Sequence, residues 1–248
     1  MNVLLFEPAE LRPDGTSVVT GARASHLRDV LRVQPGQEVR VGVIDGGLGT
    51  GTVLSLDEGT VTLGCTFDAT PARPAVDLLL ALPRPKVMRR LWAQVAALGV
   101  GQIILTNAER VERNYFDTHV LEADVYRPLL VEGLQQARDT RLPRVSIHRR
   151  LKILVEDDLD KLFPRGVRLV SNPGSELTFR SALGATPDHG PGEQARTLLA
   201  VGPEGGWTDF EMQLLTAQGF GVVGMGPRTL RSDTACVALL ALLHEALR

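Results

Sequence analysis

The stretch that decides the fold covers residues 198–243 and reads LLAVGPEGGWTDFEMQLLTAQGFGVVGMGPRTLRSDTACVALLALL. It opens with a short apolar strand at 197–201, which runs into the glycine turn GPEGG at 202–206. Thr208 then predicts the start of a helix, because Glu211 follows three residues later in the spacing of a capping box. The sequence therefore predicts a strand, a tight turn and a capped helix.

The same order repeats directly afterwards. A second strand is predicted at 222–225, a second turn begins at Gly226, and Ser232 is the expected N-cap of a last helix that ends at Leu247. Two turns thus leave the carboxyl ends of two strands, which is where open α/β sheets bind ligands. Either turn alone is weak evidence, because glycines before a capped helix usually form only a tight connection.

GPEGG does not fit the two common phosphate-binding patterns. It lacks the third glycine of the dinucleotide fingerprint and the Lys-Ser/Thr of a P-loop. A glutamate inside the turn also disfavours a bound phosphate. The sequence therefore disfavours a phosphate-binding turn at this position.

Together the two turns resemble the signature of one family. The segments V-G-P-E-G-G-W-T-x-x-E at 201–211 and M-G-P-R-T-L-R-S-D-T-A at 225–235 match the RsmE patterns I-G-P-E-G-G-F-S-x-x-E and L-G-x-R-I-L-R-x-E-T-A. RsmE proteins are SPOUT-class methyltransferases that use S-adenosylmethionine to methylate N3 of a uridine in 16S, small-subunit ribosomal RNA. The resemblance implies an α/β domain with a carboxyl-terminal deep trefoil knot, and a homodimer whose active site is completed across the interface.

The resemblance also implies site residues. Cofactor contacts are expected at Asn172, Val201, Gly202, Pro203, Glu204, Gly205, Met225, Gly226, Arg228 and Leu230. The charged residues of the turns are candidates for catalysis, namely Glu204, Arg231 and Asp233. A carboxylate can accept the N3 proton, and a fixed guanidinium can stabilise the uridine anion. Ribose-methylating relatives would show Ser-Leu-Asn at 229–231 and are disfavoured.

Composition sets the broad class. A chain of 248 residues with 44% hydrophobic content forms one large or two small globular domains. No apolar run approaches ~18 residues and the amino terminus lacks a signal peptide, so we expect a cytoplasmic protein without a membrane span. Cys65 and Cys236 are too few and too far apart for a disulfide framework or a metal site.

Cys236 also invites a rival chemistry, because C5 methylation of pyrimidines uses a cysteine nucleophile. This cysteine lies inside an apolar helix, however, and has no neighbouring base in the sequence. A free cysteine in such a place is most often a small buried hydrophobic residue. We therefore expect a structural role.

The net charge is −2, but basic and acidic side chains are distributed unevenly along the chain. Residues 71–150 carry 13 basic and 8 acidic side chains, whereas the segments on either side are net acidic. Nearly all cations are arginines, which suit phosphate binding and base stacking, although a GC-rich genome would also favour arginine. RNA contacts are expected at Arg28, Arg32, Arg84, Lys86, Arg89 and Arg90.

A linker with two prolines, at 70–74, predicts the domain boundary. Residues 1–70 contain short alternating runs that indicate five strands, with one helix at 25–32 between them. The apolar face of that helix is expected to comprise Leu27, Val30 and Leu31. The RsmE family begins with a PUA-like small β-barrel that carries H-x-x-x-V-L-R, as His26 to Arg32 do here, so 1–70 is the expected RNA-binding domain.

Residues 75–248 form the expected methyltransferase domain. Strands are predicted at 76–82, 103–106 and 167–171, and helices from Pro85 and over about 119–137. Trp92 lies in an apolar stripe and is interpreted as core, 156–160 as a solvated acidic face, and 172–174 as the first knot loop. The polar loop 185–195 suggests no chemistry. The last helix is apolar nearly all round and must be buried in the core or against another subunit.

Two departures from the RsmE pattern leave alternatives open. Residues 96–100 read AALGV instead of TELGV, and Asp139 stands where the family has an arginine. One alternative is a SPOUT methyltransferase with a different RNA target. Another is a non-catalytic ribosome-assembly factor that binds RNA through its barrel and arginines.

Overall fold

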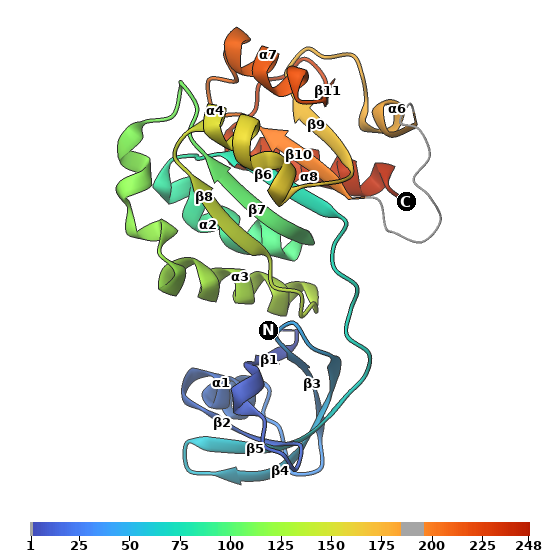
Figure 1. The fold of residues 1–248 in the computed structure, drawn as a ribbon. Coiled ribbons are helices and arrows are strands. Elements are labelled where there is room, and N and C mark those ends of the chain that lie inside the picture. The colour runs from blue at the N-terminus through green and yellow to red at the C-terminus, as the bar shows by residue number, and fades with distance from the viewer. Residues whose placement is uncertain (1, 185–195) are drawn as a thin grey trace. The chain divides into compact units, whose positions relative to one another are not determined.

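The computed structural model describes residues 2–184 and 196–248, and it contains two compact units (Figure 1). The first consists of Met1–Arg73 and Val131–Leu142, and the second of Pro74–Leu130 and Pro143–Arg248. The helix α3 (Ala123–Ala137) contributes residues to both units. Among the described residues, no helix is long and apolar enough to cross a membrane.

The first unit is built on a five-stranded mixed sheet. The strands are β1 (Leu4–Phe6), β2 (Thr16–Thr20), β3 (Glu38–Val43), β4 (Leu48–Asp57) and β5 (Thr60–Phe67). Their order is β1-β3-β4-β5-β2, in which β1 pairs parallel to β3 and the other pairs are antiparallel. Within the described residues no pairing joins β1 to β2, so the sheet predicted as a PUA-like small β-barrel is a curled half-barrel. Its inner face packs around Phe6, Val41 and Leu63, which are fully buried.

The predicted helix at 25–32 differs from expectation. It consists of α1 (Gly21–Ser25) and a π turn, η2 (His26–Val30), in which the Leu31 N–H donates to the His26 carbonyl at 3.0 Å. The wider π turn rotates successive side chains away from the 3.6-residue pattern. Leu27 is buried, but Val30 and Leu31 are 66% and 48% exposed. The predicted apolar face was therefore wrong for these two residues.

The second unit contains a six-stranded parallel sheet. Its strands are β6 (Val76–Ala81), β7 (Val100–Thr106), β8 (Arg144–His148), β9 (Val167–Ser171), β10 (Thr197–Val201) and β11 (Phe220–Val223). Their order is β11-β9-β10-β6-β7-β8. Every residue of β6, β7 and β10 is buried, as expected of strands that are covered on both faces.

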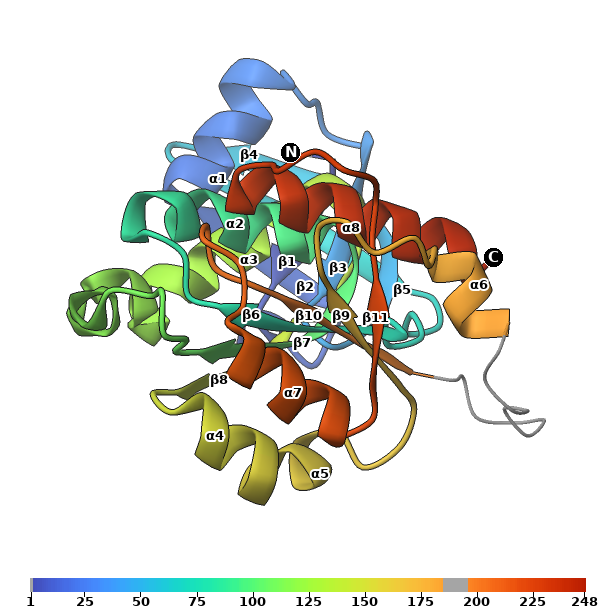
Figure 2. The same cartoon turned by 90° about the horizontal axis from the view of Figure 1, so that it is seen from above.

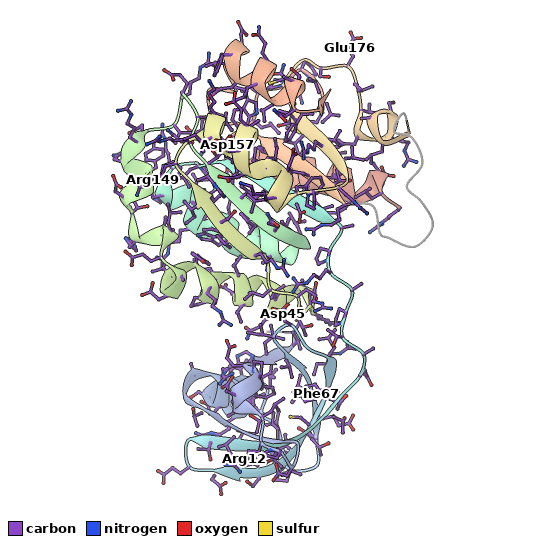
Figure 3. All side chains as sticks on the ribbon, in the orientation of Figure 1. Arg12, Asp45, Phe67, Arg149, Asp157 and Glu176 are labelled. Atoms are coloured by element: carbon purple, nitrogen blue, oxygen red, sulfur yellow. The ribbon has the colours of Figure 1, made fainter. Side chains whose placement is uncertain are left out.

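Helices cover both faces of this sheet. Figure 2 shows α2 (Pro85–Ala97) and α8 (Ser232–Ala246) over one face, and α4 (Leu151–Ile153), α5 (Leu159–Leu162) and α7 (Asp209–Ala217) over the other. Side chains fill the space between these layers (Figure 3). The remaining helices in the described part of the chain are short: α6 (Phe179–Gly184), η1 (Pro8–Glu10), η3 (Arg113–Asp117), η4 (His119–Leu121) and η5 (Leu154–Asp158). The result is an α/β domain.

Most predicted elements of this unit are confirmed. The strands at 167–171 and 197–201 have the predicted bounds, whereas β11 lies two residues before the predicted 222–225. Trp92 belongs to the core, with its Nε1–H donating to the Val120 carbonyl at 3.1 Å. In the acidic run 156–160 only Leu159 is buried, as expected of a solvated face. The loop 185–195 lies outside the described residues.

The last helix is less buried than its composition suggested. Its inner face is formed by Cys236, Leu239, Leu240 and Leu243, all of which are buried. On the opposite side Ala241 is exposed and Leu242 is 43% exposed. A single copy of the chain therefore leaves an apolar strip of α8 open to solvent.

Candidate active site

A cavity of about 300 Å³ lies at the carboxyl ends of β9, β10 and β11. It is lined by the loops that follow these three strands and by the beginning of α8. All ten residues that were expected to contact the cofactor line this one cavity: Asn172, Val201, Gly202, Pro203, Glu204, Gly205, Met225, Gly226, Arg228 and Leu230. The sequence motifs thus converge in space, although they come from three separate segments.

The turn after β10 is fastened by side chains around it. The Arg110 guanidinium, from the loop after β7, donates hydrogen bonds to the carbonyl oxygens of Gly205 and Gly206. The predicted capping box is confirmed, since the Thr208 N–H donates to Glu211 Oε2 at 2.8 Å. The other Glu211 oxygen accepts from the Glu109 N–H at 2.7 Å. The loops after β7 and β10 are therefore tied together.

Trp207 packs directly beneath this turn. A Cβ atom placed on Gly202 would lie 3.0–3.2 Å from the indole ring, so only glycine fits without displacement. Trp207 is 8% exposed and lines the cavity, and its buried Nε1–H has no partner among the described residues. Buried donors are nearly always satisfied, so this unpartnered N–H of a lining residue is a candidate contact for a ligand.

Ser232 is a second unpartnered polar group in the cavity wall. The prediction that it caps the last helix was wrong, because Arg231 occupies the N-cap position and Ser232 is the first helical residue. The Ser232 hydroxyl is buried, lines the cavity and has no hydrogen-bond partner in the described structure. A hydroxyl can both donate and accept a hydrogen bond, which makes this unpartnered group in a lining residue a candidate contact for a ligand.

The turn after β11 lies against the loop after β9. The Asn172 N–H donates to the Val223 carbonyl at 2.9 Å, and the Gly224 N–H donates to the Leu177 carbonyl at 3.0 Å. A Cβ atom on Gly224 would overlap the carbonyl oxygen of Ser175. Residues 227–231, in contrast, are exposed.

The three catalytic candidates are not placed alike. Glu204 lines the cavity, and its Oε2 lies 3.4 Å from Nε of Arg84. Asp233 does not line the cavity and accepts a hydrogen bond from Arg90 at 2.7 Å. That bond, more than any other contact, lowers the pKa of the Asp233 carboxyl, which makes it a poor proton acceptor. Arg231 is exposed and does not line the cavity, although its neighbours Leu230 and Ser232 do.

The candidate RNA-binding cations fall into the two units. In the second unit Arg84 and Arg90 are the partners of Glu204 and Asp233, and Lys86 and Arg89 are exposed on α2. In the first unit the Arg28 guanidinium donates to the Asp57 carbonyl at 3.4 Å. Arg32 is exposed and lies two residues after the π turn, in a left-handed conformation with a φ of 51°.

The cysteines are not disposed for nucleophilic chemistry. Burial raises the pKa of the Cys236 thiol to about 12 and that of Cys65 to about 11. A thiol with such a pKa contains almost no thiolate at neutral pH. The interpretation of Cys236 as a structural residue therefore agrees with its surroundings. In the described residues, no group of three His, Cys, Asp or Glu side chains is placed to hold a metal ion.

The cavity wall also contains residues that were not anticipated as site residues, among them Ser171, Trp207, Arg110 and Ser232. Arg110 follows β7 by four residues, at the same edge of the sheet as the other loops. Its position shortly after the strand predicted at 103–106 is a sequence signal that could have found it, because loops after parallel strands meet at the ligand-binding edge of the sheet. No sequence signal distinguishes Trp207 from an ordinary core aromatic.

Comparison with known families agrees with this geometry. A model described as an RNA methyltransferase domain matches residues 70–244, and one described as an RNA methyltransferase PUA domain matches residues 19–64. The chain belongs to the RNA methyltransferase family. The resemblance to RsmE is confirmed, because the relatives with similar sequences are named ribosomal RNA small subunit methyltransferase E.

Two relatives illustrate the similarity. Ribosomal RNA small subunit methyltransferase E of Treponema pallidum is 29% identical over 260 residues, covering 99% of this chain and 92% of the relative. The protein of the same name from Mycobacterium bovis is 26% identical over 244 residues, covering 97% and 90%.

Solved structures share the fold. The Neisseria gonorrhoeae ribosomal RNA small subunit methyltransferase E, bound to S-adenosyl methionine, has a TM-score of 0.76 at 22% identity, covering 99% of this chain and 97% of that one. A putative methyltransferase from Legionella pneumophila, in complex with the same cofactor, has a TM-score of 0.72 at 20% identity, covering 99% and 97%. These likenesses support the two-unit architecture described above.

Proposed function

We propose that this protein uses S-adenosylmethionine to methylate N3 of a uridine in 16S, small-subunit ribosomal RNA. The observation that carries this proposal is the single cavity in which all ten expected cofactor residues meet, in a chain of the RNA methyltransferase family. The activity named for the Treponema and Mycobacterium relatives, and the cofactor bound by the Neisseria protein, point in the same direction.

The cavity fits the proposed cofactor in size and chemistry. Small-molecule sites enclose roughly 300–1,000 Å³ and combine apolar walls with a few polar groups, and this cavity of about 300 Å³ lies within that range. The unpartnered Trp207 N–H and Ser232 hydroxyl suit a ligand that carries carboxylate, hydroxyl and ring-nitrogen acceptors. Met225, Leu230 and Leu239 supply apolar wall. When bound, adenosylmethionine supplies an electrophilic methyl group.

The residues of the chain must then make uridine N3 nucleophilic. N3 carries a proton at neutral pH, and its electron pair cannot accept a methyl group until that proton leaves. We assign Glu204 to accept the N3–H hydrogen bond and pass the proton to solvent, because it is the candidate carboxylate that lines the cavity. We assign Arg231 to stabilise the resulting anion at a uracil carbonyl oxygen. Asp233 accepts a hydrogen bond from Arg90, so we assign it to positioning Arg90 and not to contacting the uracil.

Three finer features belong to the same proposal. The loops after β9, β10 and β11 would form a trefoil knot, which the contact between residues 172–177 and the end of β11 supports. The exposed strip of α8 around Leu242 would be covered by a second copy in a homodimer. Residues 1–70 would act as an RNA-binding PUA-like domain, joined at 70–74 to a methyltransferase domain at 75–248, in a cytoplasmic enzyme.

Two measurements test this function. Isothermal calorimetry should detect adenosylmethionine binding to the purified protein; absence of heat would favour the ribosome-assembly factor. Incubation with unmodified small-subunit RNA or subunits, followed by nucleoside mass spectrometry, should detect N3-methyluridine. A different methylated nucleoside would contradict the assignment of N3.

The pH dependence tests the mechanism. Under single-turnover conditions the rate of methyl transfer should rise about tenfold per pH unit below the pKa of N3, because the anion is the reacting species. A flat profile, with chemistry rate-limiting, would contradict prior formation of the uridine anion.

A further inference from the structure

A second, smaller cavity lies directly beside the cofactor cavity. It measures about 80 Å³ and shares Arg110, Pro203 and Glu204 with its larger neighbour. Its other walls are residues 82–84, which follow β6, and residues 111, 112 and 115, which follow β7. The two cavities therefore meet at the turn after β10, which places any group in the small cavity next to the cofactor.

The walls of the small cavity match a pyrimidine. Tyr115 offers an aromatic face, Arg84 and Arg110 offer hydrogen-bond donors, and Glu204 offers an acceptor. Unpaired bases are recognised by stacking on aromatic side chains and by hydrogen bonds to their edges. A uracil edge presents one N–H between two carbonyl oxygens, which is the complement of a carboxylate flanked by guanidinium groups. Cytosine would place a ring-nitrogen acceptor against the carboxylate and fit poorly.

Tyr115 is held in place by its neighbours. Its hydroxyl donates to Glu112 Oε1 at 2.7 Å, and the adjoining Phe116 is buried at 6% exposure and anchors the short helix η3. Removal from water and the bond to Glu112 raise the pKa of the Tyr115 phenol, so it stays neutral. A ring with few rotatable bonds, fixed at its hydroxyl, loses little conformational entropy when a base stacks on it.

The pair formed by Arg84 and Glu204 can be exchanged for a base at little cost. Their side chains are 63% and 44% exposed, and the 3.4 Å separation is longer than a good charge-assisted hydrogen bond. Exposed ion pairs contribute little to stability because both partners remain solvated. A base in the small cavity would replace each partner of the pair with a hydrogen bond of its own.

We propose that the small cavity is the subsite for the acceptor uridine, in which Tyr115 stacks on the base while Arg84 and Glu204 turn from each other to its edge. This inference rests on the function proposed above. It adds Tyr115 as a residue that touches the substrate.

The test compares Tyr115→Ala and Tyr115→Phe with a control, Phe210→Ala. Phe210 is an aromatic residue that is 60% exposed and lines neither cavity. Tyr115→Ala should lower kcat/KM for small-subunit RNA by about tenfold or more, the effect of losing one base stack. Tyr115→Phe, which keeps the ring, should stay within about threefold of wild type. Adenosylmethionine affinity should not change in any variant, which excludes a general loss of the folded site.

Equal values of kcat/KM for Tyr115→Ala and Phe210→Ala would overturn the proposal. If Tyr115→Ala does not fold, Tyr115→Leu keeps the apolar bulk without the ring and should show the same tenfold loss.

A binding experiment separates failure of this inference from failure of the proposed function. If the wild type methylates no RNA, the affinity for a uridine decamer is compared with that for a decamer of abasic nucleotides. Tyr115→Ala should weaken binding of the first by about fivefold and leave the second unchanged, because stacking needs a base and phosphate contacts do not. Equal effects on the two decamers would overturn the subsite whatever reaction the protein catalyses.

Discussion

The turn after β10 is fastened by Arg110, Glu211 and the ring of Trp207, whereas residues 227–231 of the turn after β11 have no side-chain hydrogen bond among the described residues. Both turns line the same cavity. The first is preorganised at the cost of three supporting side chains. The second keeps Arg228 and Arg231 exposed and available. A site that binds both a small cofactor and a large RNA needs one preorganised turn and one turn with exposed charged side chains.

This difference predicts which residues should affect folding and cofactor affinity and which should affect turnover. Changes around the first turn should act on folding and cofactor affinity, because its side chains contact other protein groups. A change at Arg231 in the second turn should act on turnover, because this side chain has no hydrogen-bond partner among the described residues and does not line the cavity. Three variants test this division, beginning with the largest expected effect.

Arg231→Ala should reduce kcat by about 10²–10³-fold, the loss expected when one donor to a developing oxyanion is removed. Adenosylmethionine affinity, measured by calorimetry, should stay within about threefold, because Arg231 does not line the cavity. Arg231→Lys is the matched control; it keeps the charge and should recover part of the rate. Normal turnover in Arg231→Ala would remove the second turn from the chemistry.

Glu211→Gln should lower the free energy of unfolding by about 2 kcal/mol, because hydrogen bonds from the Glu109 and Thr208 N–H groups to a buried carboxylate are weakened. Urea titration measures the change. Glu245→Gln is the control, since its ion pair with Arg180 is exposed and should be worth less than about 1 kcal/mol. Equal effects of the two substitutions would mean that the first turn is not specially supported.

Trp207→Phe should have the smallest effect, a loss of adenosylmethionine affinity of about two- to tenfold, because only one neutral hydrogen bond is removed. Trp92→Phe is the comparison, because that indole N–H is already bonded to the Val120 carbonyl within the core. It should lower stability and leave affinity unchanged. Identical affinities for the two variants would show that the Trp207 N–H does not face the ligand.

The sequence predicted the second unit better than the first. β10 has the expected bounds because a strand buried on both faces is a nearly continuous apolar run, here ended by Gly202. β9 also has the expected bounds, although its Arg168 and Ser171 are only half-buried. The helix at 25–32 was misjudged because a π turn needs only one extra residue per turn, which no local pattern reveals. Val30 and Leu31, which were predicted to lie on the apolar face, are consequently exposed.

The candidate site was predictable to the extent that its residues stand in the motifs. The ten expected cofactor residues line one cavity because the carboxyl ends of parallel strands meet at one edge. Arg110 and Tyr115 come from the loop after β7, far away in sequence, and only the order of strands in the sheet brings them to the turn after β10. The pairing of Arg84 with Glu204 likewise needs the folded sheet.

The central place of β10 has a consequence for how the protein is made. β10 joins β6 to β9, and its partner residues in β6 precede it by about 120 positions. At a synthesis rate of roughly 5–20 residues per second, β6 waits about 6–24 s for its neighbour. Until then the β6–β7–β8 sheet ends in an open, apolar edge, which is a template for aggregation. A chain halted before residue 196 would depend on the ribosome or a chaperone to shield that edge.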